Sequence, residues 1–137
     1  MLAPPREDLL WQGRSSFPGT PTSIGDSRAW VRTRLVEQGI EPPADLEVVL
    51  SELATNAIRH TRSGTPGGRF ALRVLAYPDR VRIEVRDGGP FEDIHPLHPA
   101  TPALLDEHGR GLLLVEAFSA CWGRLPSRRG VYAEVAR

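Results

Sequence analysis

Lysine is missing from this sequence of 137 residues, and all 17 basic side chains are arginine. A P-loop, which places a lysine on the phosphates of a nucleotide, is therefore excluded. Cysteine occurs once, at Cys121, so the sequence predicts no internal disulfide and no cluster of thiolate ligands for a metal. The net charge is zero, because 17 acidic residues balance the 17 arginines. No overall field therefore favours a polyanion such as DNA or an anionic membrane.

Long apolar runs are lacking as well, and none approaches the length needed to cross a bilayer. The first ten residues, MLAPPREDLL, do not have the charged and then apolar pattern of a signal peptide. We therefore expect a cytoplasmic protein. A chain of this size fits one domain, and its folding buries roughly two-thirds of the surface that the unfolded chain exposes.

Apolar periodicity and turn residues divide the chain into helices and strands. One helix is expected from Ser23, whose spacing to Asp26 resembles a capping box, to Gly39, and a second from Ala44 to about His60. A third, short helix is expected after the sequence HGRG. Five strands that alternate apolar with polar residues are expected at residues 9–17, 69–77, 80–87, 121–125 and 131–136.

Most of these strands pair as hairpins and do not alternate with helices. The sequence therefore predicts an α+β fold, in which helices pack on one face of a mixed, largely antiparallel sheet. The stretch 88–109 is rich in proline and histidine and is too long for a plain connector. Loops of this length often act as lids over binding sites.

The sequence SELATNAIRHT gathers polar side chains on one side of the second helix. A helix advances about 100° per residue, so the following residues share a sector: Glu52, Asn56, Arg59 and His60. Val48 and Val49 border the same sector, and a carboxylate or carboxamide among valines is costly to bury without a partner. These side chains would then line a cleft whose ligand supplies that partner. The simpler interpretation, favoured by helix geometry alone, is that Glu52 pairs with Arg59 or Asn56 on an exposed face.

Two further features could contact a ligand. Asp87 ends a strand in EVRDGGP, where it could accept a hydrogen bond from a ligand amino group or simply form a turn with the glycines that follow. In HGRGLLLV, Gly109 and Gly111 flank Arg110 just before a helix, where backbone N–H groups and the helix dipole can face an anion. A loop that needs a flexible backbone would explain these glycines equally well.

The order of these motifs resembles the GHKL superfamily, the ATP-binding domain shared by gyrase, Hsp90, histidine kinases and MutL. ELATNAIRH resembles its N-box, DGG the start of its G1 box and GRG its G2 box. Within the superfamily, the chain most resembles the small stand-alone anti-sigma-factor serine kinases of bacteria, from the first helix to the last strand. The resemblance implies a single two-layer α/β sandwich of the GHKL (Bergerat) type over residues 1–137, with an ATP lid at 89–110.

The resemblance also implies a role for each matching residue. Asn56 would bind the Mg²⁺ that bridges the ATP phosphates, and Glu52 would be the general base toward the attacking hydroxyl. Asp87 would accept a hydrogen bond from the adenine amino group. The full set of ATP-binding residues that it implies is Asn56, Arg59, His60, Asp87, Gly89, Gly109, Arg110, Gly111 and Leu112.

The function that the resemblance implies is that of an ATP- and Mg²⁺-dependent serine/threonine protein kinase. Such a kinase sequesters a sigma factor, phosphorylates a STAS-domain anti-anti-sigma protein and forms a homodimer, without contacting nucleic acid or membrane. Three residues, Phe91, His108 and Gly130, stand where the family usually has Gly, Gly and Thr. They favour an alternative: a weak or inactive GHKL-like module that regulates a protein partner without phosphoryl transfer.

Overall fold

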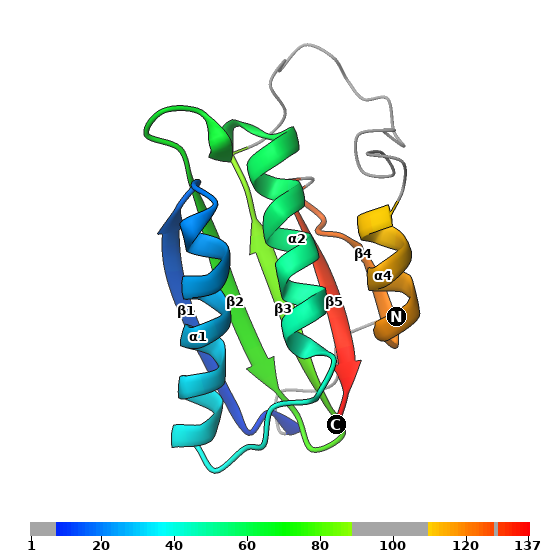
Figure 1. Ribbon diagram of the computed structural model, residues 1–137. Helices are drawn as coiled ribbons and strands as arrows, with labels where there is room; N and C mark the ends of the chain where they lie inside the picture. The colour runs from blue at the N-terminus through cyan, green and yellow to red at the C-terminus, as the bar shows by residue number, and fades with distance from the viewer. Residues whose placement is uncertain (1–7, 89–109, 128) are drawn as a thin grey trace.

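The computed structural model describes residues 8–88, 110–127 and 129–137 of the chain (Figure 1). In chain order its elements are β1 (Trp11–Pro18), α1 (Thr22–Glu37), α2 (Leu46–His60), the 3-10 turn η2 (Arg62–Gly64), β2 (Arg69–Ala76), β3 (Arg80–Arg86), α4 (Arg110–Phe118), β4 (Cys121–Arg124) and β5 (Gly130–Ala136). All five expected strands and all three expected helices are present, with small differences at their ends.

The five strands form one sheet in the order β1-β2-β3-β5-β4. Each neighbouring pair of these described strands is antiparallel. The predicted α+β fold with a largely antiparallel sheet is therefore confirmed. α1 and α2 lie side by side over one face of the sheet, and α4 packs against α2 near β4 (Figure 1).

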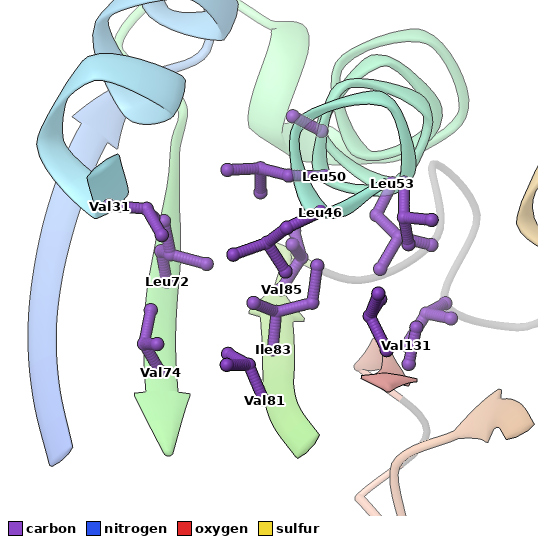
Figure 2. Packing of buried hydrophobic residues seen from close by; sticks show 14 of the residues in the cluster. Val31, Leu46, Leu50, Leu53, Leu72, Val74, Val81, Ile83, Val85 and Val131 are labelled. Atoms are coloured by element: carbon purple, nitrogen blue, oxygen red, sulfur yellow. The ribbon is translucent and has the colours of Figure 1, made fainter. Parts of the chain in front are cut away.

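The core lies between this inner face of the sheet and the two long helices (Figure 2). The helix α2 contributes the five apolar residues that the periodicity assigned to its core side, each at most 5% exposed: Leu46, Val49, Leu50, Leu53 and Ala57. Burying one leucine side chain contributes about 1.5–3 kcal/mol. This apolar stripe fixes the rotation of α2 about its axis, and hence the direction in which its polar side chains point.

The start of α1 differs from the prediction. The helix begins at Thr22 with Pro21 in the N-cap position, and no side chain caps it, so the capping box proposed for Ser23 and Asp26 is wrong. Proline suits a helix start because its φ is already helical and it has no N–H to leave unpaired. Ser23 instead lies inside the first turn, where it is 2% exposed. The predicted stop at Gly39 is confirmed, because its φ of 74° is one that glycine adopts without strain.

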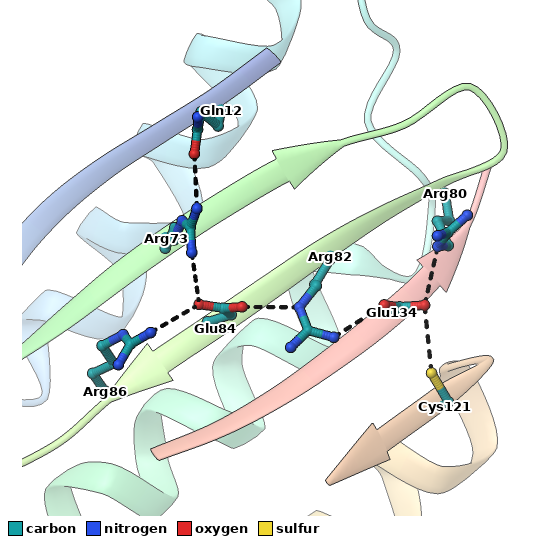
Figure 3. Close-up of polar contacts among 8 residues, drawn as sticks. All are labelled: Gln12, Arg73, Arg80, Arg82, Glu84, Arg86, Cys121 and Glu134. Carbon is teal, nitrogen blue, oxygen red and sulfur yellow. Dashed lines mark hydrogen bonds and ion pairs between the residues drawn. The ribbon is translucent and has the colours of Figure 1, made fainter. Parts of the chain in front are cut away.

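The outer face of the sheet, opposite α1 and α2, buries two glutamates among arginines (Figure 3). Glu84 is 5% exposed and Glu134 is fully buried. The guanidinium of Arg82 donates to both, from Nε to Glu84 Oε2 at 2.9 Å and from Nη1 to Glu134 Oε2 at 3.1 Å. Burial lowers the pKa of Arg82, but these hydrogen bonds raise it above its ordinary value. The sequence predicted one buried face for the hairpin of β2 and β3, whereas the structure buries charge on the second face as well.

Candidate functional site

The polar sector of α2 is half-buried at both of its central residues. Glu52 and Asn56 lie one helical turn apart, beside the buried residues Leu53 and Ala57. The side chain of Glu52 has no hydrogen bond or ion pair among the residues that the structure describes. The pairing of Glu52 with Arg59 or Asn56, which would have made this an ordinary exposed helix face, is therefore not observed.

Two nitrogen atoms in this sector are shielded from solvent and have no protein partner. Asn56 Nδ2 and His60 Nε2 are both inaccessible, and neither forms a hydrogen bond within the described part of the chain. A buried polar group without a partner costs about 1–3 kcal/mol, so each of these atoms calls for a partner, such as a ligand, an ion or a bound water. Because Asn56 and His60 are four residues apart on α2, both atoms lie on the same side of the helix.

The end of α2 is joined directly to the end of β3. Thr61 Oγ1 accepts a hydrogen bond from the backbone N–H of Ser63 at 3.0 Å and so caps η2. Ser63 is fully buried, and its Oγ accepts a hydrogen bond from the N–H of Gly88 at 3.0 Å. A Cβ on Gly88 would lie 3.1 Å from Arg62 Cβ, so the two segments are in close contact. Ser63 was not predicted as part of the site, because nothing in its local sequence marks this role.

Asp87 is held at the same end of the molecule. Its backbone N–H donates to the carbonyl of Arg129 at 3.0 Å, and the next residue, Gly88, donates to Ser63. Figure 1 shows that the end of β3, the C-terminal end of α2 and the start of α4 all lie at this end of the fold. The structure therefore brings Asp87 to the end of the sandwich at which His60 lies.

The helix α4 begins at Arg110, inside the HGRG sequence after which it was expected, and ends at Phe118. Arg110, Gly111 and Leu112 form its first turn, in which backbone N–H groups have no partner within the helix and can face an anion. Val115 is fully buried in the core and anchors the helix. The predicted lid, apart from its last residue Arg110, lies outside the described residues, as do Gly89 and Gly109.

One of the three departures from the family pattern has a structural reason. Gly130 opens β5 opposite Arg86, with a φ of 157°. A Cβ at this position would lie 2.4 Å from the carbonyl oxygen of Val85, which is too close for any side chain. The glycine is therefore required by the close approach of β5 to β3. Phe91 and His108 lie outside the described residues.

A single metal ligand was predicted here, Asn56. Among the described residues there is no group of three or more His, Cys, Asp or Glu side chains that could hold a metal ion. Mg²⁺ is commonly bound through one or two protein oxygens, with phosphates and waters completing its coordination. A half-buried carboxamide with an unpaired nitrogen fits that chemistry, since its oxygen can face an ion while a ligand completes its hydrogen bonding.

The sequence matches the model of the histidine kinase-like ATPase domain over residues 17–121. This match covers most of the chain, including the whole polar sector of α2 and the first turn of α4. The chain belongs to the histidine kinase-like ATPase family. The resemblance stated from the three motifs is thereby confirmed. As a separate finding, no helix in the described ranges is both long and apolar enough to span a bilayer.

Individual bacterial proteins are similar to this member of the histidine kinase-like ATPase family. Serine-protein kinase RsbW of Bacillus pumilus is 42% identical in an alignment of length 112 that covers 73% of this chain and 69% of the relative. Serine-protein kinase RsbW of Oceanobacillus iheyensis is 31% identical in an alignment of length 110 that covers 73% of this chain and 70% of the relative. The protein of the same name from Bacillus subtilis is 34% identical in an alignment of length 80 that covers 53% of this chain and 50% of the relative.

Proposed function

We propose that this chain is an ATP-dependent serine/threonine protein kinase of the anti-sigma-factor type. In this proposal it sequesters a sigma factor and phosphorylates a STAS-domain anti-anti-sigma protein. The similarity to relatives named serine-protein kinase supports the kinase activity. The observation that carries the proposal is the pair Glu52 and Asn56, two half-buried polar side chains one turn apart. Among the described residues, the carboxylate is unpaired and the carboxamide has a shielded nitrogen without a partner.

In this proposal Glu52 is the general base. Its carboxylate accepts the proton of a serine or threonine hydroxyl as that oxygen attacks the terminal phosphate of ATP, which requires only hydrogen-bond reach and a free carboxylate. Positioning and charge neutralisation supply most of the catalysis in phosphoryl transfer, so a single base suffices. Asn56 would hold Mg²⁺ through its carboxamide oxygen, and the bound ion would neutralise charge on the phosphates.

The remaining ATP-binding residues of this proposal follow from the resemblance. Asp87, at the end of β3, would accept a hydrogen bond from the adenine amino group, and His60 would donate from Nε2 to a phosphate oxygen. The backbone of the first turn of α4 would face the phosphates with its N–H groups. The other members of the proposed set are Arg59, Gly89, Gly109, Arg110, Gly111 and Leu112, with residues 89–110 as the ATP lid.

The cellular setting in this proposal also follows from the resemblance. The chain would act in the cytoplasm as a homodimer and as a single domain. The STAS-domain protein would be both the phosphorylation substrate and the competitor of the sigma factor for binding.

The second candidate function is a module that binds and regulates a protein partner without transferring phosphate. Phe91 and His108 favour it, because each replaces a glycine in a nucleotide-binding motif. Gly130 no longer supports it, since the close contact with Val85 accounts for that glycine. Asn56 Nδ2 and His60 Nε2, which have no partner among the described residues, favour the kinase over this module. A module that binds no nucleotide would have no nucleotide to offset the burial of these two atoms.

Transfer of radiolabelled phosphate from ATP to a purified STAS-domain protein that the chain binds tests the proposal. We expect Glu52→Gln, which keeps the shape of the side chain but removes the base, to slow transfer by about 10²–10⁴-fold. Glu37→Gln, a matched change on the exposed surface of α1, should leave the rate unchanged. Equal rates in wild type and Glu52→Gln would remove Glu52 from the mechanism. Absence of transfer by a wild type that still binds the STAS-domain protein would favour the second candidate.

A further inference from the structure

Four arginines cluster on the outer face of the sheet where β1, β2 and the end of β3 meet. Alternation along each strand and the register between strands place them on the same face, because Arg14 pairs with Arg73 and Ala71 pairs with Arg86. We call this cluster the arginine face, and it consists of Arg14, Arg69, Arg73 and Arg86. The helices α1 and α2 cover the opposite face of these strands, and Figure 3 views the outer face with those helices behind it.

Positive charge on this face is only partly neutralised by the strands that form it. Arg14 stands directly opposite Arg73, and like charges in that arrangement repel. Arg14 is exposed and has no ion pair among the residues that the structure describes. Arg69 is also exposed, and its guanidinium donates only to uncharged oxygens of Ser16, Oγ at 3.0 Å and the carbonyl at 3.2 Å.

The strands that form the arginine face contribute one carboxylate, that of Glu84. Glu84 is the single acidic residue in β1, β2 and β3. It is already shared by three arginines, with Arg82 at 2.9 Å, Arg86 at 3.4 Å and Arg73 at 3.6 Å. Its side chain is 6% exposed, so it offers no free lone pair to a further cation on the surface. The arginine face therefore carries an excess of positive charge on a chain whose net charge is zero.

We propose that the arginine face docks an acidic segment of a protein partner. The planar guanidinium group matches a carboxylate with two parallel hydrogen bonds, which makes arginine well suited to recognising Asp and Glu side chains. Arg69 and Arg73 are four residues apart on one strand, about 13 Å. An extended acidic segment that lies along β2 can place carboxylates at the same interval, since its alternate residues also point to one side.

The charge of the arginine face also argues against a second copy of the chain, or a nucleic acid, as its binding partner. A second copy of the chain would bring the same excess positive charge against it, and like charges facing each other oppose association. A nucleic acid is drawn to a domain with strong overall positive charge, whereas this chain has none. The inference concerns the face of the sheet opposite α2 and does not depend on the proposed kinase activity.

Binding of a fluorescein-labelled glutamate-rich peptide to the full chain, measured by fluorescence anisotropy, tests the inference. We expect saturable binding that weakens as salt is raised. The double variant Arg14→Gln/Arg69→Gln should bind about tenfold more weakly, because it loses two bidentate contacts. The matched control Arg32→Gln/Arg34→Gln removes the same charge from α1, where Glu47 and Glu37 already pair with these arginines, and should bind within twofold of wild type.

Three results would overturn the inference. Equal affinity of the two double variants would show that the peptide binds elsewhere. Tighter binding of a single-stranded oligonucleotide of the same charge would assign the face to nucleic acid. If sedimentation shows a dimer for the wild type and the control but a monomer for Arg14→Gln/Arg69→Gln, a second copy covers the face. Thermal unfolding of both variants would establish that each is folded under the conditions of the assay.

Discussion

Ser63 Oγ accepts a hydrogen bond from the backbone N–H of Gly88 at 3.0 Å, and this contact fastens the end of α2 to the end of β3. The two residues are 25 positions apart in the chain. Asn56 and His60 lie on α2, which leads to Ser63, and Asp87 lies at the end of β3, next to Gly88. This buried hydroxyl group therefore helps to set the relative position of the proposed phosphate and adenine contacts, together with the packing of α2 on the sheet.

Replacing Ser63 with alanine should lower the free energy of unfolding by about 1–3 kcal/mol, because it leaves the partly buried N–H of Gly88 without this partner. Urea denaturation followed by circular dichroism measures this loss. Ser16→Ala is the matched control, because its hydroxyl accepts from Arg69 on the exposed surface, and we expect a change within about 0.5 kcal/mol. Equal losses in the two variants would show that the Ser63 contact does not hold the segments together.

Glu134→Gln should destabilise the protein by about 1.5–3 kcal/mol, because it removes the buried carboxylate that Arg80 and Arg82 share and leaves each of them with one other acidic partner. The side chain of Glu134 is 1% exposed and contacts Arg80 at 3.0 Å and Arg82 at 3.1 Å. Denaturant unfolding measures the effect. Glu37→Gln, at an exposed pair with Arg34, should change stability by about 0.5 kcal/mol or less. A loss at Glu134 no larger than at Glu37 would contradict the structural role given to the network.

The thiol of Cys121 should titrate above the ordinary cysteine pKa of about 8.5. Burial raises the pKa of this thiol, and the nearby carboxylate of Glu134, whose Oε1 lies 3.5 Å from Sγ, raises it further. Because the folded state disfavours the thiolate, the contribution of this group to stability is present below the pKa of the unfolded chain and is lost as pH rises through the folded value.

Cys121 is the sole thiol in the chain, so the pH dependence of its reaction with a disulfide reagent reports this pKa directly. We expect the midpoint to be higher in the folded protein than in urea, and to move down in Glu134→Gln. A midpoint at or below the value in urea would contradict the description of this contact.

The fold was predictable where local patterns determine it. The apolar residues of α2 recur at helical spacing, and the strands 69–77 and 80–87 alternate, so their types and inner faces followed from periodicity. The start of α1 was not predicted, because Pro21 and a capping residue are both typical helix starts and only the chain path decides between them. The contacts of Glu134 with Arg80 and Arg82 could not be predicted from the sequence either, because they depend on the pairing of β5 with β3 across a long sequence separation.

The candidate site was predictable in part for the same reason. Glu52, Asn56 and His60 share one helix, so their common side follows from helix geometry. The joining of Ser63 to Gly88 arises from tertiary packing and has no local signature. The close approach that requires Gly130 likewise depends on the carbonyl of Val85 in another strand, which no local pattern reveals.

The central claim is that Asn56 lies in a nucleotide site, and calorimetric titration with Mg·ATP tests it most directly. We predict that the wild type binds, and that Asn56→Ala binds at least about tenfold more weakly because it loses the contact to the ion. Gln38→Ala, which removes an exposed carboxamide at the end of α1, should bind like the wild type. Equal affinity of the Asn56→Ala variant and the wild type, or no binding by either, would contradict the account.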